Sequence, residues 1–221
     1  MKKKFVPVLL TAMLLTLATG CTPNQPSLSE KAETNSEENT EYADSPFTSW
    51  LPQGIEQVMS ETAPNKDLKQ LIIDYYEIPE DSWEETRYYY NYVDLDEDGA
   101  DEIFAVIIGD YTSGTGGDSA LWCSAEGGKL KIRQAFTLVS TPVIITKEAA
   151  NDGASEAKGL IMQRRGEAEP EIVQLTCKDG IYTNVTDAFV FENLDGVEGT
   201  AILCNDLIED MENGTCLTLA D

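Results

Sequence analysis

The chain contains no histidine among its 221 residues. This absence excludes Ser-His-Asp and Cys-His catalysis, HExxH zinc sites and every other metal cluster that needs an imidazole. Cysteine is scarce as well, with five residues, and none has a histidine that could activate its thiol. We find no other recognisable catalytic motif, and we therefore expect a protein that is not an enzyme.

Basic residues are also few, with 15 Lys and Arg against 40 Asp and Glu and a formal net charge of −25. Such a surface repels phosphate backbones, so a nucleic-acid partner is not expected. It equally disfavours electrostatic adsorption to anionic lipid headgroups. Any contact with a membrane must therefore come from another source.

A long transmembrane run is missing from the N-terminus, where the apolar stretch at residues 5–17 falls short of the ~20 residues that cross a bilayer. Three lysines at residues 2–4 precede it, and the small residues 18–20 follow it, immediately before Cys21. This order predicts an export signal over residues 1–20. Its removal takes away three basic residues and no acidic ones, which leaves 12 against 40, a formal charge of −28.

The junction at Cys21 resembles the bacterial lipobox, with Ala18 at the place where Leu is usual and Leu17 one step earlier. The resemblance implies that the Cys21 thiol receives a diacylglycerol and that Cys21 becomes the new N-terminus of a lipoprotein. Two or more acyl chains hold a protein stably on a bilayer, so the expected location is the extracytoplasmic face of a bacterial cell membrane, reached through the lipid anchor. The alternative is an ordinary secretory signal that happens to contain Cys21.

Residues 21–47 and 48–221 differ in composition. The first segment is rich in Ser, Glu, Asn, Thr and Pro and poor in large apolar side chains, which predicts a disordered, lipidated tether. The second has the length and apolar content of a single globular extracytoplasmic domain.

The domain is predicted to be α+β and β-dominated, with an antiparallel sheet and two N-terminal helices. Apolar residues recur at helical spacing over residues 50–59 and 65–77, and Asn65 is placed to cap the second helix. Short β-rich runs follow, separated by turn residues. The expected strands are residues 87–94, 102–109, 119–124, 130–137, 143–147, 159–164, 171–177 and 181–184, and a short helix is expected at residues 206–212.

The strongest chemical pattern lies between the first two of these strands. Asp94, Asp96 and Asp98 occupy positions 1, 3 and 5 of an acidic loop, and a glycine at position 6 permits a sharp bend. The carbonyl of Ala100 at position 7 and the carboxylate of Glu102 at position 9 can complete an oxygen-rich coordination sphere. The pattern predicts a structural Ca²⁺ site, and the alternatives are a metal-free acidic turn or another ion.

The loop resembles the strand-borne DxDxDG calcium loops of FG-GAP and VCBS-type repeats, which Asp94, Asp96, Asp98, Gly99 and Glu102 match position by position. It is not a full EF-hand, because position 12 is alanine and the flanks are predicted strands. The longer run at residues 88–122 resembles a group of exported bacterial lipoproteins. That resemblance implies an envelope location and no particular activity.

Four cysteines, Cys123, Cys177, Cys204 and Cys216, remain after Cys21. They allow three pairings, and Cys204 with Cys216 is the candidate disulfide because the two are closest in sequence. The alternative is that each thiol is a buried small apolar group.

Three functions remain open from the sequence, of which the third is a purely structural role in the cell envelope. The first is a non-enzymatic binding or envelope-surface role with an unknown protein or glycan ligand. The second is a carboxylate-dependent hydrolase of cell-wall or extracellular glycans, which needs a cleft with two acids about 5–10 Å apart. Tyrosines at residues 88–90 and 92 are either a sugar-stacking face or ordinary strand residues.

Overall fold

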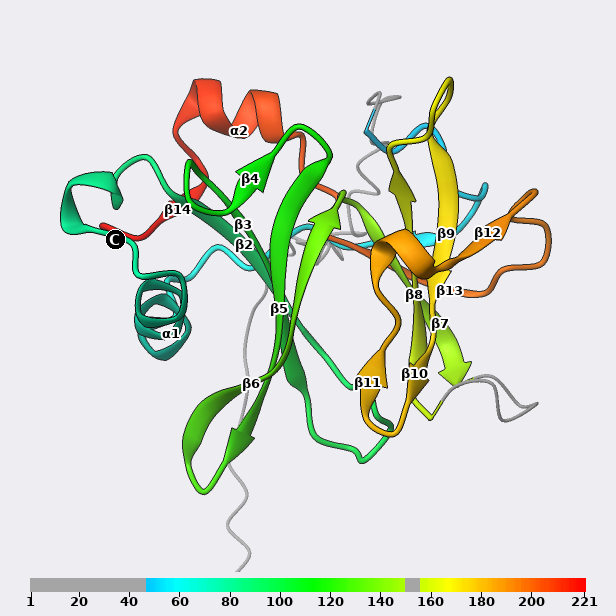
Figure 1. The fold of residues 1–221 in the computed structure, drawn as a ribbon, viewed down its shortest axis with the longest axis horizontal. Helices are drawn as coiled ribbons and strands as arrows, with labels where there is room; N and C mark the ends of the chain where they lie inside the picture. The colour runs from blue at the N-terminus through cyan, green and yellow to red at the C-terminus, as the bar shows by residue number, and fades with distance from the viewer. Residues whose placement is uncertain (1–46, 150–155) are drawn as a thin grey trace, which may run out of the picture. The chain divides into compact units, whose positions relative to one another are not determined.

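The computed structural model describes residues 47–149 and 156–221, all within one unit that spans residues 42–221. The predicted signal, the lipidation at Cys21 and almost all of the predicted tether lie outside the described residues. The described part is β-dominated with antiparallel sheets, as predicted, and it contains two α-helices (Figure 1). It contains two six-stranded sheets and a small hairpin, rather than the one sheet that we expected.

The first sheet carries the acidic loop and is antiparallel throughout. Its strand order is β14-β2-β3-β5-β4, and β6 pairs with β5. The members are β2 (Arg87–Val93), β3 (Glu102–Ile108), β4 (Ser113–Gly114), β5 (Gly117–Glu126), β6 (Lys129–Val139) and β14 (Leu217–Thr218).

The second sheet has the order β1-β13-β7-β8-β9-β12. All its pairs are antiparallel except β1 with β13. The members are β1 (Glu56–Gln57), β7 (Val143–Ala149), β8 (Lys158–Arg164), β9 (Glu171–Leu175), β12 (Phe189–Phe191) and β13 (Gly199–Ile202). A separate hairpin pairs β10 (Cys177–Lys178) with β11 (Ile181–Tyr182), and two 3₁₀ helices, η1 (Glu80–Ser82) and η2 (Val185–Asp187), lie in connections.

The main core lies between the two sheets. Phe104, Trp122 and Phe136 of the first sheet pack in one cluster with Leu160 and Met162 of the second. The central strand β3 is buried along nearly its whole length, because its other face is covered by helix α1 (Lys66–Tyr76). This explains the almost uninterrupted apolar run of β3, since a strand that is covered on both faces needs no polar alternation.

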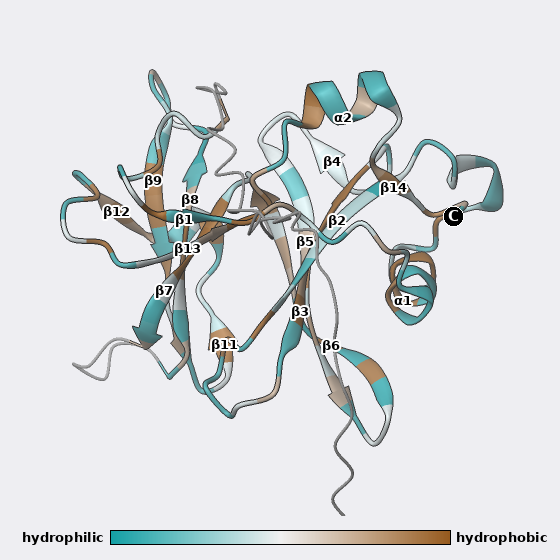
Figure 2. Cartoon of the chain, turned by 180° about the vertical axis from the view of Figure 1, so that it is seen from behind, coloured by the Kyte–Doolittle hydropathy of each residue, from teal (hydrophilic) through white to brown (hydrophobic). Residues whose placement is uncertain are grey.

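Helix α1 confirms the second predicted N-terminal helix. The side chain of Asn65 accepts a hydrogen bond from the backbone N–H of Leu68 at 3.0 Å, which caps the helix as expected. Leu68, Ile72 and Ile73 are buried against the first sheet, and Figure 2 shows the apolar residues of α1 on one side of the helix. The short C-terminal helix α2 (Leu207–Asn213) also lies close to its predicted bounds, capped by Asp206.

The other predicted N-terminal helix, at residues 50–59, is wrong. Gly54 adopts a φ of +81°, which interrupts a helix, and the two-residue strand β1 follows it. The apolar residues that suggested a helix pack instead on the outer face of the second sheet, where Trp50, Ile55 and Met59 contact the cluster around Ile144 and Ile161. Tertiary packing thus overrides the local periodicity.

No α-helix in the described ranges is long and apolar enough to span a bilayer.

Candidate metal centre

The acidic loop connects β2 to β3, and the pairing of these strands brings its two ends together. Val93, the last residue of β2, lies opposite Glu102, the first residue of β3. Asp94 and Glu102 therefore lie close together at the ends of the paired strands, although they are eight positions apart in sequence. This juxtaposition follows directly from an antiparallel pair joined by a connection of a few residues.

Three carboxylates converge at this point. One oxygen each from Asp94, Asp96 and Glu102 lies within 4.8 Å of the other two. Such a group can hold a metal ion, because a cation bound between the carboxylates offsets their mutual repulsion. The three residues belong to the set predicted from the sequence.

The burial of Glu102 is unusual for a carboxylate. Glu102 is only 3% exposed, and its Oε2 accepts a hydrogen bond from the backbone N–H of Leu95 at 2.9 Å. Burial raises the pKa of Glu102 above its usual value despite this hydrogen bond, and the nearby Asp96 adds to the rise. The group thus pays an electrostatic penalty whenever Glu102 is ionised without a neighbouring cation.

Two carboxylate oxygens in the group have no hydrogen-bond partner among the described residues. They are Oδ1 of Asp94 and Oδ1 of Asp96, and both atoms are buried. A buried acceptor without a partner costs about 1–3 kcal/mol, and more when it is charged. A bound cation would satisfy both oxygens at once.

The other loop residues shape the turn. Asp94 Oδ2 accepts a hydrogen bond from the N–H of Gly99 at 3.2 Å, and Gly99 has a φ of +85°, a conformation that favours glycine. Asp98 Oδ1 accepts one from the N–H of Ala100 at 2.8 Å. The carboxylate of Asp98, which we predicted as a ligand, is not in the converging group. The carbonyl of Ala100 stays a prediction.

Arg133 is a functional neighbour that the sequence did not indicate. Its guanidinium forms an ion pair with Asp96 Oδ2, and its Cζ lies 4.2 Å from the ring centroid of Trp122, in a cation–π contact. Arg133 lies on β6 and reaches the loop only because β6 pairs with β5. Sequence spacing carries no signal for this contact.

The loop also touches the second sheet. The backbone N–H of Lys158, at the start of β8, donates to the carbonyl of Leu95 at 2.8 Å. The N–H of Ala149, at the end of β7, donates to Oε2 of Glu97 at 3.3 Å. The acidic loop therefore connects two strands of the first sheet and is hydrogen-bonded to two strands of the second sheet.

The cysteines do not pair in the structure. Within residues 47–149 and 156–221, Cys123, Cys204 and Cys216 are free thiols, so the candidate Cys204–Cys216 disulfide is not formed. The physical reason is their placement: Cys204 packs on the outer face of the second sheet, whereas Cys216 packs against the core between the sheets. Burial raises the pKa of Cys123 to about 12 and that of Cys204 to about 11, which disfavours the reactive thiolate.

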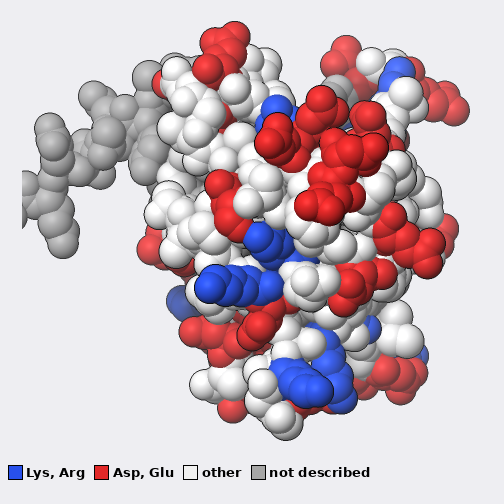
Figure 3. Space-filling view, turned by 90° about the vertical axis from the view of Figure 1, so that its left-hand side faces the viewer, with Lys and Arg blue, Asp and Glu red and all other residues white. Residues whose placement is uncertain are grey.

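The predicted tyrosine face is mostly internal. Tyr88, Tyr89 and Tyr90 are at most 2% exposed, and of the four only Tyr92 is half-exposed. The alternative of ordinary strand residues is therefore correct for three of the four, and these three are not accessible for stacking on a sugar. On the surface, acidic side chains spread widely over the face shown in Figure 3, and Lys and Arg gather near its centre and its lower edge.

Comparison of the chain with protein-family models, with curated proteins and with solved structures finds no match.

Proposed function

We propose that this chain is a lipid-anchored, extracytoplasmic calcium-binding protein with a binding or envelope-surface role. In this proposal Ca²⁺ is structural and holds the junction between the two sheets. One observation carries the proposal: three carboxylates converge, with two buried oxygens that lack partners, in a loop that is hydrogen-bonded to both sheets. Binding of the ion to the folded state alone would add stability by mass action.

Calcium fits the donor set better than other metals do. The three side-chain donors are all carboxylates, whereas zinc and copper sites favour imidazole or thiolate ligands. Backbone carbonyls and water can supply the remaining oxygens of a sphere of six to eight ligands, and Ca²⁺ accepts irregular arrangements of this kind. Mg²⁺ demands a nearly regular octahedron and releases water reluctantly, so a loop of this shape selects against it.

The buried position of Glu102 argues against the hydrolase alternative at this loop. A raised pKa is typical of a general acid, but a carboxyl that is 3% exposed cannot be reached by a glycan. We therefore assign the loop a metal-binding role and propose no catalytic step.

The proposed lipid anchor at Cys21 would hold the domain outside the cell, where free calcium is abundant relative to the cytosol. The predicted cleavage makes the formal net charge more negative, from −25 to −28. In this proposal the anchor, rather than the acidic surface, therefore supplies the membrane contact. Mass spectrometry of the protein from a bacterial host tests this part: a diacylated Cys21 supports it, and an unmodified Cys21 contradicts it.

A thermal melt of the full chain with calcium and with EGTA tests the metal site. At a calcium concentration 100 times Kd the added stability is about 2.7 kcal/mol. For a domain of this size this corresponds to a rise in Tm of roughly 5–10 °C. Asp94→Asn should abolish most of the rise, and Glu126→Gln, which removes one exposed acidic charge far from the loop in sequence, should leave it unchanged. A wild type that melts at the same temperature in both solutions would refute the proposal.

A further inference from the structure

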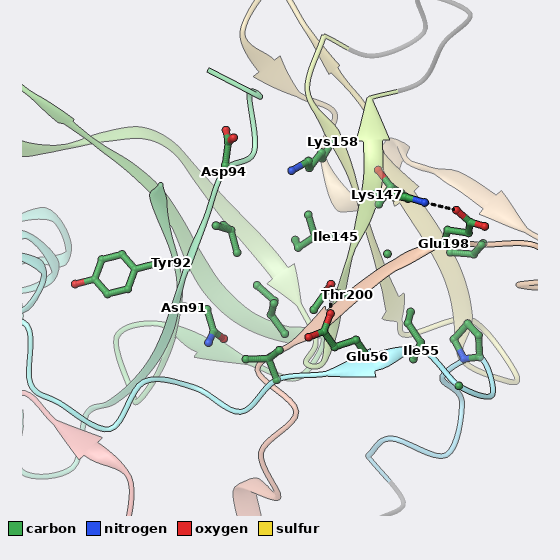
Figure 4. A pocket seen from close by; sticks show the side chains of 18 of the residues that line it. Ile55, Glu56, Asn91, Tyr92, Asp94, Ile145, Lys147, Lys158, Glu198 and Thr200 are labelled. Carbon is green, nitrogen blue, oxygen red and sulfur yellow. Dashed lines mark hydrogen bonds and ion pairs between the residues drawn. The ribbon is translucent and has the colours of Figure 1, made fainter. Parts of the chain in front are cut away.

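A cavity of about 840 Å³ lies beside the acidic loop; of the three converging carboxylates it is lined by Asp94 but not by Asp96 or Glu102. Its walls come from the end of β2, from β7, β8 and β13, and from the segment around β1, as Figure 4 shows. This volume is within the range of 300–1,000 Å³ that is typical of small-molecule sites. Residues 52–58, which contain β1 instead of the predicted helix, contribute one wall of the cavity.

Most of the charged groups in the cavity wall have partners. The ammonium of Lys147 forms an ion pair with Glu198 at 3.2 Å, and Oε2 of Glu56 accepts a hydrogen bond from the hydroxyl of Thr200 at 3.2 Å. Lys158 differs, because among the described residues its ammonium forms no ion pair within 4.0 Å. Figure 4 shows the Lys158 side chain extending into the cavity toward the side of Asp94. Lys158 is thus the cation that is available to a ligand.

The deeper wall is aliphatic. Ile145 and Ile202 line the cavity while remaining 6% and 3% exposed, and Ile55 and Val58 line it from the β1 segment. This surface suits an aliphatic body, since it offers apolar contact without aromatic stacking. A ligand that used both parts of the cavity would carry an anionic group at one end and an apolar body at the other.

We propose that this cavity binds a small amphiphilic monocarboxylate, with its carboxylate on the Lys158 ammonium and its aliphatic chain against Ile145 and Ile202. The charge of the ligand is limited to one, because the wall also carries the carboxylates of Glu56, Asp94, Asp101 and Glu198, which repel any further negative charge. The proposal goes beyond the calcium site and does not depend on a metal.

The test uses the full chain with ¹³C-labelled isoleucine δ1 methyl groups, in EGTA, titrated with octanoate and followed by NMR. The methyl signals of Ile55, Ile145 and Ile202 should shift and saturate, whereas those of Ile72 and Ile73 under α1 should not. Because the titration contains no metal, it can succeed even if the calcium proposal fails, and the reverse also holds.

Two comparisons isolate the role of Lys158. Lys158→Gln should weaken octanoate binding roughly tenfold, the effect of losing one charge-assisted hydrogen bond. Lys147→Gln is the matched control and should change it much less, because Lys147 is already paired with Glu198. Octanamide, which has the same chain without the charge, should bind both variants equally and so report an intact cavity. The proposal is overturned if octanoate shifts none of the three cavity methyls, or if Lys158→Gln binds octanoate as the wild type does.

Discussion

Arg133 forms an ion pair with Asp96, 37 positions away in sequence, and stacks on Trp122 at the same time. The side chains of Arg133 and Asp96 are 30% and 20% exposed, so solvent screens the pair only in part. The guanidinium thus brings a positive charge to a group of three carboxylates. A metal ion that binds there must share Asp96 with Arg133 or displace it.

Replacing Arg133 should therefore change the two states of the loop in opposite directions. Arg133→Gln is expected to lower the stability of the metal-free protein by about 1 kcal/mol, because it removes a partly buried ion pair. It should also strengthen calcium binding, because the carboxylate of Asp96 is then free to coordinate. Thermal melts should show a lower Tm in EGTA and a larger rise on adding calcium than in the wild type.

Lys131→Gln provides the matched control for this substitution. Lys131 lies two positions earlier on β6 and pairs with Glu126 at 2.7 Å, and both side chains are more than half exposed. Its loss removes the same charge from the same strand without touching the loop, so the calcium-induced rise should equal that of the wild type. Equal rises for Arg133→Gln and the wild type would mean that Arg133 does not compete with the ion.

The loop carboxylates are expected to contribute unequally to calcium affinity. Asp96→Asn should reduce calcium affinity strongly, since Asp96 is one of the three converging groups. Asp98→Asn should reduce it far less, because Asp98 Oδ1 accepts a bond from Ala100 and an asparagine oxygen can accept the same bond. Calorimetric titration of calcium into the two variants measures the difference. Equal losses would place Asp98 among the direct ligands, as the sequence pattern predicted.

The convergence of Asp94 and Glu102 could be predicted because it depends on local order alone. Two strands joined by a short loop pair with each other, and the DxDxDG spacing then sets the turn. The positions of β2 and β3, and helix α1 with its Asn65 cap, follow from equally local patterns. Local patterns were sufficient in these places because α1 buries one apolar face and β2 and β3 are runs of β-forming residues bounded by turn residues.

Contacts between distant segments could not be predicted in the same way. The approach of Arg133 to Asp96 requires the β5–β6 pairing and a shift of register between Trp122 and Cys123. The failed helix at residues 50–59 has the same origin, since the packing of Trp50, Ile55 and Met59 on the second sheet decides the local conformation. The division of the strands into two sheets likewise depends on which strand faces pack together. Local sequence patterns do not reveal such contacts between distant segments.

The raised pKa of Glu102 gives the calcium site a predictable pH dependence. Coordination needs the ionised carboxylate of Glu102. Calcium affinity should therefore fall as the pH is lowered through the raised pKa of Glu102, which lies above the ordinary value of 4.5. In EGTA, Glu102 affects the stability of the metal-free protein, and this effect has the opposite pH dependence. The folded state holds the proton more tightly than the unfolded state, so Glu102 favours folding at low pH, and this contribution is lost as the pH rises through the folded pKa.

Melting curves from roughly pH 4 to pH 7, with calcium and with EGTA, measure both effects. Glu102→Gln should remove this component of the pH dependence in EGTA and should abolish the rise with calcium at every pH. An affinity that stays constant down to the pH at which an ordinary glutamate titrates would show that Glu102 is not a ligand.

The capping bond of Asn65 offers a test of the fold that is independent of any metal. Asn65 Oδ1 accepts from the N–H of Leu68, and its Nδ2 donates to the hydroxyl of Tyr92 at 3.2 Å. Asn65→Ala loses both bonds and should destabilise the protein by about 1 kcal/mol, chiefly through the lost cap. Tyr92→Phe loses only the exposed second bond and should stay within about 0.5 kcal/mol of the wild type.

Asn65→Asp keeps the size of the side chain and the capping acceptor, and it removes only the Nδ2 donor. An aspartate keeps the acceptor for Leu68 and places a negative charge at the positive end of α1, so its stability should equal or exceed that of the wild type. Urea unfolding midpoints for the three variants measure the order, with Asn65→Ala lowest. Because α1 covers the face of the first sheet opposite the main core, an unchanged midpoint for Asn65→Ala would mean that this helix is held by its buried side chains, Leu68, Ile72 and Ile73, and owes nothing to its cap.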